Sequence, residues 1–260
     1  MPDFRLSQSS LKDLAKPTTC PKRWEAQYVN KEFRPEPSEA MILGLWFERL
    51  IFGEDPDHPR ELPPLPTTNT GKPTAAVQRM QAQAERVKTM LYDKESDEYL
   101  GYTVTDIQSV IVTEEPFIII IDFLATNEDG EECMFDLKLT ADLSNTFGDY
   151  AWGNIESMDL FQQKIYQKVF EDFHGTKLAE NNILVADYST EQRVKLFKLI
   201  VSEESIMGAE QRVTETWKVI NHYTENGYPT DPSIDECKNC PLICTSRITP
   251  PSVVIEEVYI

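Results

Sequence analysis

The chain has 260 residues, of which 40% are hydrophobic and 27% charged, and this composition is typical of one large soluble domain or of one domain with an appendage. Its net charge of -19 argues against a protein that coats nucleic acid through a basic surface, although an enzyme could still hold DNA through metal ions and a few basic side chains. No apolar run approaches the roughly 20 residues that span a bilayer. The start, "MPDFRLSQSS", lacks the pattern of a secretory signal, so we expect a cytoplasmic protein with no membrane partner.

The first part of the chain predicts helices. A serine can cap a short helix in "LSQSSLKDLAK", and a second helix is expected through "KRWEAQYVN". The segment "SEAMILGLWFERLIFG" combines a capping Ser38, apolar residues at helical spacing and a stop at Gly53. Residues 55–73 are rich in proline, threonine and charge and predict a loop, and a further helix is expected over about residues 74–92.

The middle of the chain changes to β-branched residues, punctuated by "EEP" and "NEDG", which predicts a meander of strands. Residues 118–121 are all isoleucine, apolar on both faces, and predict a buried central strand. A helix is expected over about residues 154–173, strands in "NNILVADYS" and "RVKLFKLIV", and a long helix over residues 202–223. This order predicts an α/β fold with a mixed central β-sheet flanked by helices.

Charged residues stand at the expected ends of two neighbouring strands. Asp122 directly follows the isoleucines, and "FDLKLT" places Asp136 and Lys138 on one face of the next strand. If the strands pair through "NEDG", the two carboxylates converge, and a divalent cation such as Mg²⁺ relieves their repulsion. Lys138 would then hold or activate a water beside the metal. The alternative is a salt bridge on the surface at the end of a hairpin, which is favoured when the Asp-x-Lys motif stands alone.

The Asp-x-Lys motif does not stand alone, because three other short motifs accompany it. In chain order the motifs are "GLWFE" at residues 44–48, Asp122, "DLK" at residues 136–138 and "QQKIY" at residues 162–166. In this order and spacing they resemble the PD-(D/E)XK nuclease superfamily, and within it the RecB-type and phage-exonuclease branch. The segment "LSQSSLKDLAKPTTCPKRWEAQY" also resembles the N-terminal segment of that branch. The resemblance implies a restriction-endonuclease-like core.

The resemblance implies roles for the acidic residues and the lysine. Asp122 and Asp136 would bind Mg²⁺ or Mn²⁺ together with the backbone carbonyl of Leu137. Lys138 would position the attacking water or stabilise the charged phosphate. Glu48 stands where many RecB-type members have His and lambda-exonuclease-like members have Glu. It would be a further metal ligand, and a salt bridge to a neighbour is the alternative.

The "QQKIY" motif implies a contact with the substrate. Gln162 and Tyr166 are four residues apart and share one helix face. In the superfamily this pair borders the active site and contacts the substrate strand. The alternative is the polar edge of an amphipathic helix.

The function that the resemblance implies is phosphodiester hydrolysis by a metal-dependent DNA nuclease, more an exonuclease than an endonuclease. It would act in DNA recombination, repair or phage DNA processing, in the cytoplasm of a bacterium or a phage-infected host cell. A recombinase, single-strand annealing protein or helicase would be its protein partner. The alternative is a nuclease-fold subunit that binds DNA or protein without cutting, but the intact set of Asp122, Asp136 and Lys138 argues against it.

The cysteines predict a second metal centre. Cys237, Cys240 and Cys244 lie close together near the C-terminus, which in a reducing compartment indicates metal binding before a disulfide. Cys20 is the fourth candidate ligand. RecB-type relatives carry a 4Fe-4S cluster with one early and three late cysteines, which implies the same cluster here. Because the last gap is shorter than in those relatives, a structural Zn²⁺ on the same four thiolates is the alternative.

The resemblance also implies the domain organisation. It extends over about residues 5–244 and implies a single nuclease domain over residues 1–260, with a core at about residues 38–224. The metal cluster would join the N-terminal helical segment, residues 5–31, to the C-terminal tail, residues 229–260.

Overall fold

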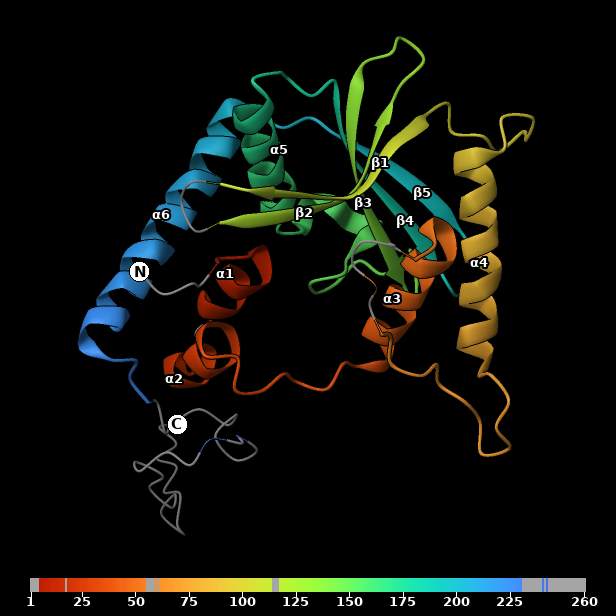
Figure 1. The fold of residues 1–260 in the computed structure, drawn as a ribbon. Coiled ribbons are helices and arrows are strands. Elements are labelled where there is room, and N and C mark those ends of the chain that lie inside the picture. Colours follow the sequence, from red (N-terminus) through yellow and green to blue (C-terminus); the bar gives the residue numbers. More distant parts are fainter. Residues whose placement is uncertain are drawn as a thin grey trace, which may run out of the picture. The chain divides into compact units, whose positions relative to one another are not determined.

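The computed structural model describes residues 5–16, 18–54, 59, 61–113, 117–230, 240 and 242. The chain forms two compact units, one of Met1–Arg34 with Gln211–Ile260 and the other of Pro35–Glu210. Among the described residues, no helix is long and apolar enough to cross a membrane. Figure 1 labels the helices and strands in chain order.

The helices are α1 (Gln8–Leu14), α2 (Pro21–Trp24) with its π-helical continuation η1 (Glu25–Val29), α3 (Glu39–Phe52), α4 (Ala75–Tyr92), the 3-10 helix η2 (Trp152–Ser157), α5 (Phe161–His174) and α6 (Glu203–Asn226). The strands are β1 (Thr103–Val112), β2 (Ile118–Thr126), β3 (Glu132–Thr140), β4 (Glu180–Asp187) and β5 (Val194–Leu199).

The predicted boundaries of α3 are confirmed. The Ser38 side chain accepts a hydrogen bond from the Met41 N–H at the start of the helix. Gly53 ends it with φ at 85°, a conformation that L-residues rarely adopt. Both ends of α3 are therefore fixed by local chemistry.

The larger unit is built on a mixed sheet of five strands in the order β1-β2-β3-β4-β5. Neighbouring strands pair antiparallel except β3 and β4, which are parallel. The parallel pair needs a long connection, and η2 and α5 lie within it. This arrangement confirms the predicted α/β fold with a mixed sheet flanked by helices.

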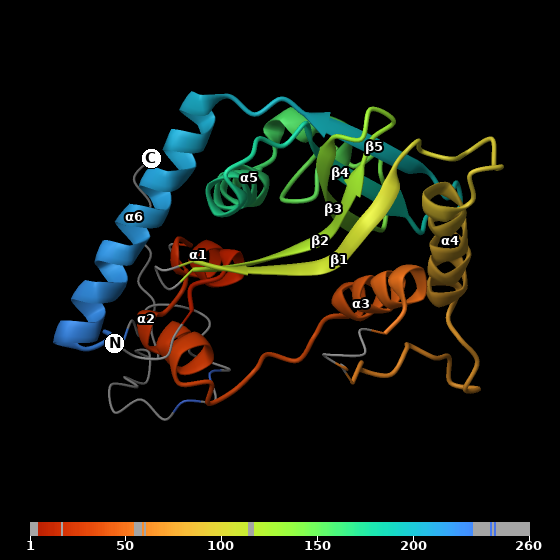
Figure 2. The same cartoon turned by 45° about the horizontal axis from the view of Figure 1, so that its top comes forward.

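Helices cover both faces of the sheet (Figure 2). On one face, α3 and α4 pack on side chains such as Phe123, Phe135 and Leu184, all of them buried. On the other face, Ile183 and Val185 of β4 pack with Trp152 of η2 and its neighbours. Because side chains alternate along a strand, Asp136 and Lys138, which are in register with Ile183 and Val185, face this second side.

The expected burial of residues 118–121 is wrong in part. Ile119 and Ile121 are buried, but Ile120 is 43% exposed. The reason is that β2 pairs with β3 only from Phe123 onward, whereas residues 118–121 pair with β1 alone. Asp122 also lies inside β2 rather than after its end, at the position where β2 and β3 separate.

The helix predicted over residues 154–173 begins later than expected. Residues 152–157 form the short η2, within which Asn154 has non-helical angles of -144° and 67°. Met158 is extended, and α5 begins at Phe161, whose N–H donates to the Asp159 side chain. At Gly153 the chain is held against the loop before it rather than in a helix, because the Gly153 N–H donates to the Asn145 carbonyl (2.8 Å) and a Cβ there would lie 2.7 Å from the Ser144 carbonyl oxygen.

The smaller unit has its own core around Trp24. The indole N–H of Trp24 donates to the Ser10 carbonyl (2.8 Å), and its ring stacks on Tyr228 with centroids 6.0 Å apart. The Lys22 N–H donates to the carbonyl of Pro229 (3.1 Å). Residues from both ends of the chain therefore pack together in this unit.

Candidate active site

The candidate site opens where β2 and β3 separate. Their pairing stops at Phe123 and Phe135, so the next residues, Asp122 and Asp136, stand at the fork between the strands. The N–H of Leu137 donates to Asp122 Oδ2 (2.7 Å), which fixes the Asp122 carboxylate across the fork. The separation of the strands thus frees the Leu137 N–H from the β2–β3 ladder, and this N–H binds Asp122 and holds the two carboxylates together.

Lys138 joins the two carboxylates. Its Nζ lies 2.5 Å from Asp136 Oδ1 and 3.8 Å from Asp122 Oδ2. This confirms the expectation from strand alternation that Asp136 and Lys138 share a face. It also shows that the ion pair is part of a larger cluster, since it includes an acid from another strand.

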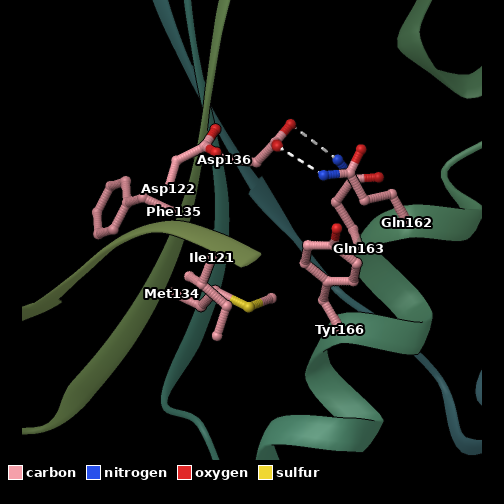
Figure 3. A pocket seen from close by; sticks show the side chains of 8 residues that line it. All are labelled: Ile121, Asp122, Met134, Phe135, Asp136, Gln162, Gln163 and Tyr166. Atoms are coloured by element: carbon pink, nitrogen blue, oxygen red, sulfur yellow. Dashed lines mark hydrogen bonds between the residues drawn. The ribbon is translucent and has the colours of Figure 1, made fainter. Parts of the chain in front are cut away.

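Helix α5 supplies amide donors to Asp136. The side chains of Gln162 and Gln163 donate to its two oxygens, Oδ1 and Oδ2, each over 3.0 Å (Figure 3). Tyr166 lies one turn further along the helix and lines the same small cavity of about 10 Å³, about the space that a water molecule needs. Sequence reasoning identified Gln162 and Tyr166 but missed Gln163, whose position directly beside Gln162 was the available clue.

The carboxylates are short of positive charge. Burial raises the pKa of Asp122 to about 8; Lys138 opposes this, but the negative charges of Asp136 and Glu48 add to it. The pKa of Lys138 is raised above its ordinary value, because attraction to Asp136 and Asp122 outweighs the effect of burial. Burial and the same two carboxylates raise the pKa of Tyr166 to about 12. The cluster therefore favours an added cation.

Glu48 is close enough to Asp122 for its charge to raise the pKa of that carboxyl, but it comes from a different helix than the two glutamines. It is on α3, which packs on the face of the sheet opposite α5 (Figure 2), and its Oε1 accepts a hydrogen bond from the Gln108 side chain. Among the described residues, no three acidic, histidine or cysteine side chains group closely enough to hold a metal ion. The role of Glu48 as a metal ligand stays a prediction.

The residues at the fork fit a divalent cation by their chemistry. Asp122 and Asp136 are oxygen donors on adjacent strands. Asp136 Oδ1 accepts from both Lys138 and Gln162, whereas Asp136 Oδ2 and Asp122 Oδ2 each keep a lone pair beyond the bond from Gln163 or Leu137. Mg²⁺ and Mn²⁺ prefer such hard oxygen ligands, commonly one or two carboxylates with waters completing the shell. The raised pKa of Asp122 points the same way, because a cation would favour its charged form.

The predicted cysteine cluster lies in part outside the described residues, which include neither Cys237 nor Cys244. Cys20 is buried at the N-terminus of α2, and Cys240 is half-buried. The cluster therefore stays a prediction.

The fold and this fork define a protein of the PD-(D/E)XK class. The chain matches the family described as "PDDEXK-like domain of unknown function (DUF3799)" over residues 7–243, and it belongs to that family. Family membership, together with the mixed five-stranded sheet, establishes the restriction-endonuclease-like core.

Solved structures that match the chain include the following two. A crystal structure described as a "putative exonuclease" from Eubacterium rectale is 17% identical, with a TM-score of 0.63, and the match covers 99% of this chain and 91% of that one. That likeness supports the fold. The structure of SSO0001 is 13% identical over 95% of this chain and 88% of that one, and its TM-score of 0.34 is too low to support an argument. No curated protein matches the chain.

Proposed function

We propose that the protein is a metal-dependent nuclease that hydrolyses phosphodiester bonds in DNA. The observation that supports this most is the convergence of Asp122, Asp136 and Lys138 at the fork, with the amides of α5 around Asp136. A divalent cation held by the two carboxylates and the Leu137 carbonyl would lower the pKa of a water and neutralise charge on the phosphate. Membership of a PDDEXK-like family agrees with this chemistry.

The chain's own residues would divide the remaining work. Lys138, a cation 2.5 Å from Asp136, can donate to a phosphate oxygen and stabilise the charge that develops there. Gln162 and Gln163 hold the Asp136 carboxylate by its two oxygens and so fix its direction. Tyr166, on the same helix, borders the place where the substrate strand would lie. Glu48, whose charge acts on Asp122, would be a further ligand.

Digestion of end-labelled DNA tests this proposal. Wild type should cleave single- or double-stranded DNA with Mg²⁺ or Mn²⁺ and lose activity with a chelator. Asp136→Ala and Lys138→Ala should each reduce cleavage at least about a hundred-fold. Lys94→Ala, in an exposed turn, is the matched control and should cleave normally. Equal cleavage by wild type, Asp136→Ala and Lys138→Ala would refute the assignment.

The finer proposal is an exonuclease of the RecB-type or phage branch. The fold likeness to a protein described as a "putative exonuclease" supports it at low identity. Linear DNA should then be degraded while covalently closed circles of the same sequence survive. Such an enzyme would act in recombination, repair or phage DNA processing, beside a recombinase, single-strand annealing protein or helicase in the cytoplasm. Cleavage of the closed circles at the same rate would instead indicate an endonuclease.

A 4Fe-4S cluster on Cys20, Cys237, Cys240 and Cys244 is the proposed second metal centre, with Zn²⁺ as the alternative occupant. The packing of residues 22 and 24 on residues 228 and 229 supports it, since the early and late segments already meet in one unit. Purified protein absorbing near ~410 nm with bound iron would support the cluster, whereas colourless protein with stoichiometric zinc would support the alternative. Cys240→Ser should release the metal, and Cys133→Ala, in the sheet core, should retain it.

A further inference from the structure

A second, larger cavity lies on the α3 side of the sheet. It has a volume of about 280 Å³ and is bounded by α3, the chain after it, and the part of the β1–β2 ribbon that has left β3. Its apolar wall is formed by Leu45, Phe52, Leu62, Ile107, Val110 and Ile120. Its polar groups are Glu48, Arg49 and Gln108. A mostly apolar hollow with a few convergent polar groups is typical of a small-ligand site.

The cavity adjoins the candidate active site. Ile120 is two residues from Asp122 along β2, a separation of about 7 Å in a strand. Glu48 lines the cavity, and its charge also acts on Asp122. One nucleotide could therefore place its phosphate at the carboxylates and its base in the cavity.

A strained backbone conformation lies between the cavity and the candidate active site. Gln108 lies within β1 and has φ at 52°, a left-handed conformation that is uncommon for a residue other than glycine. It stands across from Asp122, between the pairs Ile107–Phe123 and Ser109–Ile121, and its side-chain amide donates to Glu48. Strain of this kind persists only where the surroundings enforce it, and it concentrates at functional sites.

The charges in the cavity select the type of group that it can receive. Glu48 is an acid, and the guanidinium of Arg49 already pairs with Glu54 over 2.9 Å. An anionic phosphate would be repelled here, whereas a flat neutral group can pack on the aliphatic and aromatic wall. Val110 and Ile120 support this, because they are 53% and 43% exposed at the cavity and gain by being covered.

We propose that this cavity binds the nucleobase of the nucleotide whose phosphate is at the candidate active site. The proposal deepens the proposed nuclease function and rests on it. The ring would pack against the apolar wall, and Glu48 and Gln108 would offer hydrogen-bond partners to its edge. Packing against this wall, to which Phe52 contributes an aromatic ring, uses the flat face that every base has, which suits an enzyme that digests DNA of any sequence.

Filling the cavity tests the proposal. Val110→Trp places a large ring in the hollow, and Leu45→Trp does so from α3, so that one variant remains if the other does not fold. Val112→Trp is the matched control, since it lies on the same strand and face and is 40% exposed but does not line the cavity. Thermal unfolding checks that each variant is folded.

The first measurement is the affinity of metal-free protein for 2′-deoxyadenosine, determined by saturation-transfer NMR. Deoxyadenosine carries no phosphate, so this result does not depend on cleavage. Wild type and Val112→Trp should bind it, and the cavity-filled variants should bind at least about ten-fold more weakly. Equal binding by all of them, or equal competition by N-acetyl-leucinamide, would overturn the proposal.

The second measurement compares cleavage of DNA that ends in a natural nucleotide with cleavage of DNA that ends in an abasic one. Wild type and Val112→Trp should favour the natural end by about ten-fold in kcat/KM, and Val110→Trp should lose that preference. Cleavage without any preference in wild type would overturn the base site and leave the nuclease proposal standing. Deoxyadenosine binding that Val110→Trp abolishes, with no cleavage of either DNA, would retain the base site and refute the nuclease.

Discussion

Two aspartates on the same sheet, Asp187 and Asp122, have opposite surroundings. Asp187, at the end of β4, accepts hydrogen bonds from the N–H groups of Leu143 (3.1 Å) and Arg193 (2.9 Å), the Ser189 hydroxyl (2.8 Å) and the Arg193 guanidinium (3.0 Å). Burial would raise its pKa, but these donors outweigh burial and lower it. Asp122 has one backbone donor, a lysine 3.8 Å away and two acidic neighbours, and its pKa is raised to about 8.

This difference in surroundings indicates that Asp187 has a structural role and that Asp122 is a candidate functional residue. The donors of Asp187 satisfy its charge and tie the chain after β3 to the end of β4, so the protein needs nothing further there. Asp122 is left in an environment that opposes its charge unless a cation arrives. Perturbed acids of this second kind cluster at functional sites.

The largest expected effect is on activity at the fork. Asp136→Asn keeps the shape of the side chain but removes the charge beside Lys138. We expect cleavage to fall about a thousand-fold, roughly 4 kcal/mol, in protein that thermal unfolding shows to be folded. Measurement of kcat/KM on labelled DNA checks it, with Asp129→Asn in the exposed hairpin turn as the control. Wild-type kcat/KM in Asp136→Asn would place Asp136 with Asp187 as a structural residue.

The next largest effect is the loss of protein stability when Asp187 is changed. Asp187→Asn leaves the Arg193 guanidinium without its buried partner and turns an acceptor into a donor facing N–H groups. We expect the free energy of unfolding to fall by about 2–3 kcal/mol, measured by urea denaturation. The residual folded enzyme should retain its kcat. A loss of kcat with unchanged stability would contradict the assignment of Asp187 as structural.

A smaller effect is the pH dependence of stability in the metal-free protein. Because the folded pKa of Asp122 is raised from 3.8 to about 8, its contribution is fully present below pH 3.8 and is lost as the pH rises through 8. Asp122→Asn should remove this decline, and Mg²⁺ or Mn²⁺ should reduce it in wild type. Asp187 acts oppositely, since the stability from its lowered pKa is lost as the pH falls below its ordinary range.

Urea denaturation between pH 5 and pH 9, with and without the metal, measures that slope. Asp129→Asn serves again as the control and should follow wild type. An identical slope in wild type and Asp122→Asn would show that the surroundings of Asp122 do not oppose its charge.

The smallest effect concerns the residue that sequence reasoning missed. Gln163→Ala removes one of the two amides that hold Asp136 and should lower kcat/KM about ten-fold, about 1.4 kcal/mol. Lys164→Ala, the next residue on the helix, does not line the cavity and is the control. Restoration of activity by Gln163→Asn is not expected, since the shorter amide cannot span the same distance. An unchanged kcat/KM in Gln163→Ala would mean that Gln162 alone positions Asp136.

Local signals in the sequence predicted much of the fold. The Ser38 cap and the Gly53 stop each act within a few residues of the helix end that they define, so α3 begins and ends where expected. The start of α5 was wrong, because the backbone approach at Gly153 is a contact between segments that the local pattern does not encode.

The sequence by itself determined the element types and the shared face of Asp136 and Lys138, because these follow from helix periodicity and strand alternation. It also gives the order of the motifs directly. Only the tertiary structure decided that β2 leaves β3 at Phe123, that Gln163 reaches Asp136 and that Gln108 turns to Glu48. These are pairings between distant segments, and they depend on where the sheet ladder stops. Because the β2–β3 ladder stops there, Asp122 and Asp136 come together in a cluster that favours an added cation.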